Sequence, residues 1–304
     1  EIPQEQTLTT SPTEITATKA QLTETSISPI TTKLNNNTVS DELKATYGIF
    51  ADAATGIDDI QIIENDKLKI TVANKGGRIT SVILKEYQTY DSLALDLFDA
   101  DSSRFNLQFT TGHNINTADL YFVAEQDHNS LSMKLKADNN HYVEYLYTLT
   151  DDYLIDFDIN LVGMDDFIPT GVNYMNLEWQ MKTPQTEKSK TNQDMYTGIQ
   201  YQYSANEVDY LSFTSTDEDK INARLNWVAF KQQFFSAIFI AKDGFDKPTN
   251  LTSTKSEGSK FIKDLAAQFE LPYTHKRDEK LSFQFYFGPN HYKTLKSYNK
   301  GFEE

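Results

Sequence analysis

Apolar and polar residues alternate along this chain from about Ile60 onward, and this pattern limits the fold more than any other feature. Leu68, Ile70 and Val72 fall on one side of the first such run. The same spacing recurs in four further segments, residues 131–135, 155–161, 175–181 and 283–287. Successive side chains of a strand point to opposite faces of a sheet, so a period of two residues predicts strands with one buried face.

Turn signals such as "NKGGR" and "LTDD" separate these runs, and no alternation of strands with helices is visible. We therefore predict an all-β sandwich. The pair Gly76-Gly77 predicts a hairpin turn, because glycine tolerates a positive φ. Residues 261–271 fit a strand, although Phe261, Leu265 and Phe269 also recur at helical spacing.

The two ends of the chain differ from this β-rich middle. Residues 1–55 begin with a segment rich in Thr, Ser and Pro that is predicted to be a flexible linker, because its sparse apolar residues cannot offset the entropy of ordering it. Near the other end, Tyr292, Leu295 and Tyr298 recur at intervals of three residues after Pro289. This spacing predicts a short amphipathic helix within residues 289–304.

Composition excludes several classes of function. The formal net charge is -16, and so acidic a chain repels phosphate backbones, which argues against nucleic-acid binding. The chain has no cysteine, which removes thiol catalysis and is compatible with an oxidising compartment. No apolar run reaches the roughly 18–20 residues that cross a bilayer.

The sequence contains no group of residues with the spacing of a known catalytic or metal-binding motif. The five histidines are scattered and show no metal-ligand spacing. "DADSS" at residues 99–103 lacks the glycine and the closing glutamate of a calcium loop. Asp156 and Asp158 share a strand face, and a solvated acidic face explains them in so acidic a chain. No catalytic, cofactor-binding or metal-binding residue is therefore predicted.

The segment from Asn226 to Ile240 is the most apolar part of the chain. Apolar residues fall on both of its faces, which predicts a central strand covered on both sides. Lys231, Gln232 and Gln233 interrupt it, and we expect a bulge or bend there. The alternative is an exposed apolar wall that binds chains or lipids.

Three segments together resemble the large periplasmic domain of YidC, the bacterial membrane protein insertase. They are "NDKLKITVANKGGRITSVILKEY", "LNWVAFKQQFFSAIFI" and "FQFYFGPNHYKTLK", in the order in which the family carries them. The residues that carry the resemblance, called the signature residues below, are Gly76, Gly77, Arg78, Trp227, Gln232, Gln233, Phe234, Phe235, Gly288 and Pro289. We expect these residues to be structural.

The resemblance implies a β-supersandwich, similar to galactose mutarotase folds, over residues 56–288. It implies a C-terminal helix within residues 289–304 that leads towards a membrane core not present in this chain. It also implies a non-enzymatic role in the periplasm, at the bacterial inner membrane, as a scaffold or chaperone in membrane protein insertion. The implied partners are the Sec translocon with its accessory subunits, nascent membrane proteins and the membrane core of the same chain. Contact through aromatic and aliphatic groups on a sandwich face or in a cleft is expected.

Two alternatives remain at this stage. A mutarotase-like sugar epimerase or carbohydrate-binding module would share the fold. Epimerase chemistry needs a histidine acid and a glutamate base that face each other in a cleft. An exported glycan-binding lipoprotein would explain the linker but not the three segments.

Overall fold

Antiparallel sheets make up most of the protein. A computed structural model describes residues 36–246, 248–258 and 260–303, and for residues 36–40 the backbone only. The largest sheet has nine strands in the order β13 (Val208–Tyr210), β12 (Gly198–Tyr203), β15 (Leu225–Lys231), β16 (Phe235–Phe245), β19 (Asp278–Pro289), β10 (Leu154–Val162), β9 (Tyr142–Leu149), β8 (Ser130–Lys136) and β7 (Val123–Gln126). All of its neighbouring strands pair antiparallel.

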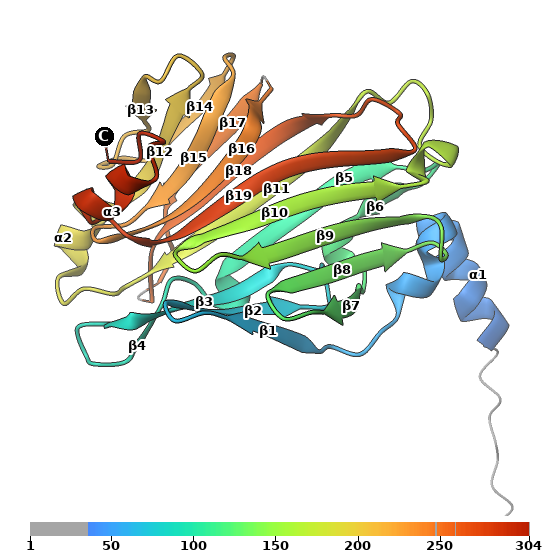
Figure 1. Ribbon diagram of the computed structural model, residues 1–304, viewed down its shortest axis with the longest axis horizontal. Coiled ribbons are helices and arrows are strands. Elements are labelled where there is room, and N and C mark those ends of the chain that lie inside the picture. The colour runs from blue at the N-terminus through green and yellow to red at the C-terminus, as the bar shows by residue number, and fades with distance from the viewer. Residues whose placement is uncertain (1–35, 247, 259, 304) are drawn as a thin grey trace, which may run out of the picture. The chain divides into compact units, whose positions relative to one another are not determined.

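Two smaller sheets accompany it. The six-stranded sheet has the order β14 (Asp217–Ile221), β17 (Thr249–Lys255), β18 (Phe261–Pro272), β11 (Tyr174–Pro184), β5 (Ser103–Thr110) and β6 (Asn114–Asn116). The four-stranded sheet has the order β1 (Ile60–Glu64), β2 (Leu68–Ala73), β3 (Ile79–Gln88) and β4 (Ala94–Asp96). Figure 1 shows strands β1 to β4 below the two larger sheets.

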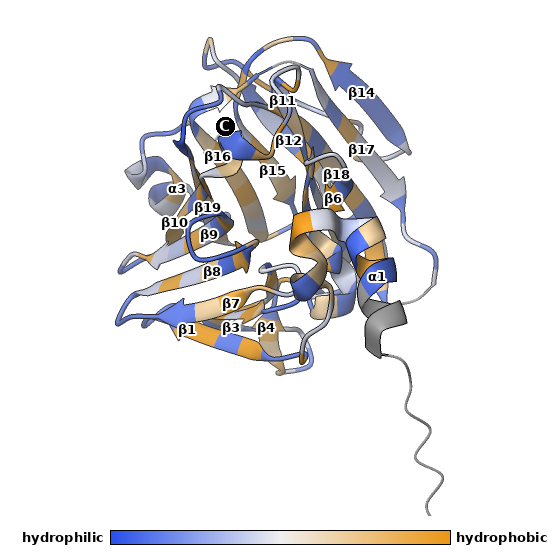
Figure 2. Ribbon diagram, turned by 90° about the vertical axis from the view of Figure 1, so that its right-hand side faces the viewer, coloured by the Kyte–Doolittle hydropathy of each residue, from blue (hydrophilic) through white to orange (hydrophobic). Residues whose placement is uncertain are grey.

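The core lies between the nine-stranded and six-stranded sheets and is rich in aromatic rings. Trp179 of β11 stacks on Phe230 of β15 with ring centroids 3.8 Å apart. Phe239 of β16 contacts Phe105 of β5 and Phe285 of β19 at centroid distances of 6.0 and 4.6 Å. Stacked and edge-on pairs of this kind add to the free energy of burial. The all-β sandwich predicted from the alternation is confirmed, and Figure 2 shows the alternating hydropathy along the strands.

The predicted strands and the predicted hairpin turn are confirmed. All the alternating runs lie in strands, and residues 261–271 fall in β18, not in a helix. Between β2 and β3, Gly76 and Gly77 adopt φ values of 81° and 61°. The amide of Ala73 donates to the carbonyl oxygen of Arg78 at 3.0 Å and closes this turn.

The prediction of one long strand from Asn226 to Ile240 was wrong. The segment forms two strands, β15 and β16, which pair antiparallel with Lys231 opposite Ser236. The amide of Gln232 donates to the carbonyl oxygen of Phe235 at 2.8 Å, so the interrupting residues form a tight hairpin turn. Both strands are covered on both faces, as expected, because consecutive residues are buried from Trp227 to Phe230 and from Phe235 to Ala241.

The predicted linker is folded in its last part. Helix α1 spans Asn36–Tyr47, and the 3-10 helix η1 spans Gly48–Ala54. The ring of Phe50 in η1 is fully buried and contacts Phe109 of β5. The prediction of a flexible linker is therefore wrong for residues 36–54, and residues 1–35 lie outside the described residues.

The C-terminal segment contains the predicted short helix, shifted along the chain. Helix α3 spans Tyr292–Ser297, whereas Pro289, where we expected the helix to begin, is the last residue of β19. Leu295 and Phe302 are buried, so the segment packs on the protein through two apolar anchors. The remaining short helices are α2 (Lys190–Met195), η2 (Ala100–Ser102), η3 (Thr117–Asp119) and η4 (Met164–Asp166).

Candidate functional site: a polar cleft on the six-stranded sheet

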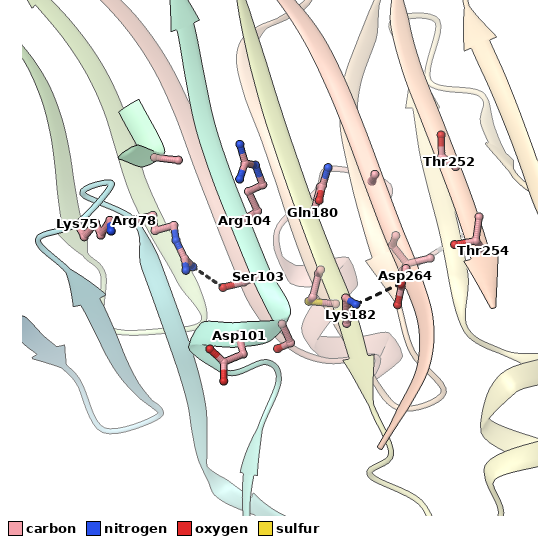
Figure 3. Close-up of a pocket in the computed structure, with 15 residues that line it drawn as sticks. Lys75, Arg78, Asp101, Ser103, Arg104, Gln180, Lys182, Thr252, Thr254 and Asp264 are labelled. Atoms are coloured by element: carbon pink, nitrogen blue, oxygen red, sulfur yellow. Dashed lines mark hydrogen bonds and ion pairs between the residues drawn. The ribbon is translucent and has the colours of Figure 1, made fainter. Parts of the chain in front are cut away.

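An open cleft of about 530 Å³ lies over the outer face of the six-stranded sheet. Strands β5, β11, β17 and β18 form its floor, and the turn between β2 and β3 forms one wall (Figure 3). Its charged lining consists of Lys75, Arg78, Arg104, Lys182, Asp101 and Asp264. The cleft is thus more polar than the aromatic and aliphatic surface expected from the resemblance.

Strand alternation and cross-strand register place these side chains together. Gln180 and Lys182 point to the cleft because Trp179 and Met181 of the same strand point into the core. Gln180 lies opposite Arg104 of β5, and Lys182 lies opposite Asp264 of β18. Residues distant in sequence thereby become neighbours on one face.

The four cations of the cleft differ in their ion pairs. Arg104 pairs with Glu178 at 2.9 Å and Lys182 pairs with Asp264 at 3.6 Å. No carboxylate among the described residues forms an ion pair with Lys75 or Arg78. The wall therefore presents positive charge that an anionic group can approach.

The guanidinium of Arg78 is held in place by neutral oxygen atoms. It donates to the hydroxyl of Ser103 at 2.7 Å and to the carbonyl oxygen of Ala100 at 2.9 Å. Burial lowers the pKa of Arg78 below its usual value, yet arginine stays charged in proteins at neutral pH. Fixed orientation and retained charge suit this group to bind a carboxylate or phosphate.

The structure divides the signature residues between two places. Arg78 lines the wall of the cleft, and Gly76 and Gly77 precede it in the turn between β2 and β3. The others lie on β15, β16 and β19 and in the turn between β15 and β16. Phe235 is paired with Pro289, and Gly288 is paired with Ser236. The first group thus lies beside the cationic wall, whereas Trp227 of the second group contacts Phe302 in the C-terminal segment.

Exposure differs within this second group. Trp227 is 1% exposed, whereas Phe234, at the tip of the β15–β16 turn, is 51% exposed. The structural role assigned to the signature residues remains a prediction, and burial supports it better for Trp227 than for Phe234. Sequence reasoning missed Lys75, Arg104 and Lys182, which lie on strands or turns with no local motif that identifies them.

None of the residues that line the cleft is a histidine. Asp156 and Asp158 of β10 pair with Lys242 and Lys280, both at 2.8 Å. The expected solvated acidic face is wrong for Asp158, which is buried. Within the described ranges, no group of three or more His, Asp or Glu side chains is placed to hold a metal ion. None of the helices described is long and apolar enough to span a membrane.

His141 provides a pH-dependent contact away from the cleft. Its Nδ1 lies 2.7 Å from Asp138 Oδ2 and its Nε2 lies 3.3 Å from Asp166 Oδ2. The hydrogen bond with Asp138 raises the pKa of His141 above 6.5, and a backbone hydrogen bond from Asn140 lowers the pKa of Asp138. The contact therefore stabilises fully below the unfolded pKa of histidine and is lost as pH rises through the raised pKa.

We expect His141→Asn to lower the melting temperature more in mildly acidic buffer than in alkaline buffer, where only the edge-on contact of the ring with Phe167 is lost. The difference arises because the imidazolium attracts Asp138 and Asp166 only while it is charged. Thermal unfolding of both proteins across this pH range is the measurement. A deficit of the same size at every pH would contradict the assignment. Because the site is exposed, the effect is small.

Comparison with known proteins places this fold in a family. Residues 61–304 match the YidC periplasmic domain family. The chain is 37% identical over 259 residues to the membrane protein insertase YidC of Bacteroides fragilis, covering 84% of this chain and 42% of that protein. It is 35% identical over 264 residues to the corresponding protein of Parabacteroides distasonis, covering 85% and 42%. The chain belongs to the YidC periplasmic domain family, as the resemblance indicated, and spans less than half the length of these relatives.

Solved structures with a similar arrangement of strands are described as sugar epimerases. A putative aldose 1-epimerase from Escherichia coli has a TM-score of 0.45 at 12% identity, covering 76% of this chain and 99% of that chain. A galactose mutarotase-like protein from Lactobacillus casei has a TM-score of 0.48 at 10% identity, covering 75% and 100%. A similarity of this size carries no argument about chemistry.

Proposed function

We propose that this chain is the periplasmic, non-enzymatic part of a membrane protein insertase of the bacterial inner membrane. Two observations support this: the chain belongs to the YidC periplasmic domain family, and its relatives are named membrane protein insertases. Insertion itself would need the further length that the relatives have beyond this domain. In this arrangement residues 1–35 would tether the folded part, and residues 289–304 would lead towards the membrane core.

We further propose that the cleft briefly holds translocated segments of client proteins through their acidic side chains. The observation that carries this proposal is the pair of cations, Lys75 and Arg78, that face an open cleft and form no ion pair within the described chain. A carboxylate can approach both while the main chain of an extended segment lies across the sheet. Such contacts would require only acidic side chains in the client segment and no particular order of its other residues.

Peptide binding tests the cleft. The probe is a fluorescent, extended peptide rich in Glu and Ser, compared with the same peptide carrying Lys in place of Glu. We expect the purified chain to bind the acidic peptide, and Lys75→Ala with Arg78→Ala to weaken binding by about tenfold, because close charge pairs contribute on this scale. Added salt should weaken the wild-type complex as well.

A matched control removes the same charges elsewhere. Lys276→Ala with Arg277→Ala changes an exposed lysine and an exposed arginine that lie outside the cleft. Peptide affinity should stay at the wild-type value in this variant. Equal affinity for both peptides, or equal losses in both double variants, would refute a cleft that selects acidic segments.

Docking of the Sec translocon or its accessory subunits is a second proposed partnership. Capture of purified Sec subunits by this chain, with an unrelated acidic domain as control, would test it. Sugar epimerisation is the rival activity. The absence of histidine from the cleft lining disfavours it, and anomerisation of galactose above the uncatalysed rate would overturn the non-enzymatic proposal.

A further inference from the structure

Six exposed apolar side chains gather at one end of the protein. They lie on four segments, residues 87–94, 185–196, 231–235 and 290–297, which we call the loop end. The side chains are Tyr90, Leu93, Met195, Tyr196, Phe234 and Tyr292, and each is about half exposed or more. Figure 1 shows α2, α3 and the β3–β4 connection at this same end, on the left of the view.

Hydrogen bonds between the segments place them side by side. The amide of Tyr90 donates to the carbonyl oxygen of Thr186 at 3.0 Å, which joins the first segment to the second. The side chain of Gln193 donates to that of Gln232 at 3.3 Å, which joins the second to the third. The amide of Asn290 donates to the carbonyl oxygen of Phe234 at 2.7 Å, which joins the third to the fourth. The loop end is therefore one surface.

Buried polar groups hold this surface in position. The side chain of Gln193 is fully buried, and its oxygen accepts from the amides of Thr186 and Glu187 at 3.0 and 3.2 Å. The side chain of Asn290 donates to the carbonyl oxygen of Gln232 at 2.8 Å, directly under the turn that carries Phe234. These hydrogen bonds fix the backbone that carries the exposed apolar side chains. The side chains therefore stay exposed to water and do not fold back onto the core.

The charge of the loop end is opposite to that of the chain. Its four segments carry five lysines against three acidic residues, whereas the whole chain has a formal net charge of -16. Apolar and aromatic tips mixed with lysines are the composition of surfaces that lie at the boundary between lipid headgroups and acyl chains. Each basic residue near an anionic bilayer adds to the attraction.

We propose that the loop end docks on a lipid bilayer that contains anionic lipids, with Leu93, Tyr196 and Phe234 reaching the interfacial layer. A second copy of this chain is disfavoured as the occupant, because it would bring two positively charged surfaces together. The proposal is independent of the cleft, whose charged lining lies outside these segments. It assigns a membrane-facing side to the domain, and it offers a reason for the exposed signature residue Phe234.

Vesicle binding tests the proposal. The probe is vesicles of phosphatidylethanolamine and phosphatidylglycerol, compared with vesicles of phosphatidylcholine alone. We expect the purified chain to co-sediment with the anionic vesicles, and the triple variant Leu93→Glu, Tyr196→Glu, Phe234→Glu to lose at least about tenfold in vesicle affinity.

The matched control places the same charges on another exposed apolar surface. Ile57→Glu, Ile60→Glu and Val123→Glu change residues on or beside β1 and β7, which Figure 2 shows towards the bottom of the opposite side. This variant has the same net charge as the triple variant and should lose much less affinity. No binding by the wild type, or equal losses in both variants, would overturn the proposal. Self-association that the loop-end variant abolishes, without vesicle binding, would overturn it in favour of a second copy.

A second measurement avoids multiple substitutions. Because the chain has no cysteine, Leu93→Cys and Ile60→Cys each give a single site for a polarity-sensitive dye. We expect a blue shift of emission on adding anionic vesicles for the label at position 93 and none at position 60. A shift at position 60 alone, or no shift at position 93 when the labelled chain co-sediments with the vesicles, would overturn the docking orientation.

Discussion

Replacing Trp227 with alanine is expected to lower the free energy of unfolding by about 3–5 kcal/mol. The indole is 1% exposed, and its Nε1 donates to the carbonyl oxygen of Lys300 at 3.0 Å. Its ring also contacts Phe302 with centroids 5.7 Å apart. The substitution leaves a cavity under the C-terminal segment and removes a donor from a buried acceptor. Urea denaturation of both proteins measures the change.

A conservative variant separates the two contributions. Trp227→Phe keeps most of the apolar volume and removes only the hydrogen bond to Lys300, so we expect a loss of about 1–2 kcal/mol. If Trp227→Ala costs no more than Trp227→Phe, the ring is not part of the core. The exposed binding wall weighed for this segment would then be supported.

Replacing Gly77 with valine is expected to cost about 3 kcal/mol or more. Gly77 has a φ of 61°, which a β-branched residue adopts only with strain. A Cβ at this position would lie 2.7 Å from Cδ1 of the buried ring of Phe122, so the ring or the turn must move. Thermal and urea unfolding report the loss.

Gly112 provides the matched control. It has a φ of 88°, and a Cβ there meets no atom within 4 Å, so Gly112→Val carries the backbone strain without the clash. We expect it to cost about 1–2 kcal/mol, less than Gly77→Val. Equal losses would show that the close approach of Phe122 does not matter. Gly77→Val should also weaken binding of the acidic peptide, because the next residue, Arg78, lines the wall of the cleft.

The hairpin of β15 and β16 shows where sequence reasoning failed in the fold. A strand buried on both faces has no polar alternation, so its ends have no periodic signal. The turn itself consists of Gln232, Gln233 and Phe234, none of which is a typical turn residue. The segment folds back into a hairpin because β15 pairs with β12 and β16 pairs with β19, one on each side.

The prediction of a flexible linker failed for residues 36–54 for a related reason. Of the side chains described in that region, residues 41–54, only Phe50 and its neighbour Ala51 are buried, too few apolar residues to produce a period. Phe50 and the partly buried residues beside it pack against the core. Such tertiary packing supplies most helical stability.

The order of polar and apolar residues alone determined the sandwich, the positions of most strands and the glycine turn, because burying one face of a strand is a local requirement. Membership of the family was likewise readable from three short segments. The cleft and the loop end were decided by the tertiary structure alone. Arg78 comes from the turn between β2 and β3, and Arg104 and Lys182 come from different strands, so their proximity depends on register and sheet order. Those are set by contacts between segments far apart in the chain, which leave no pattern within any one of them.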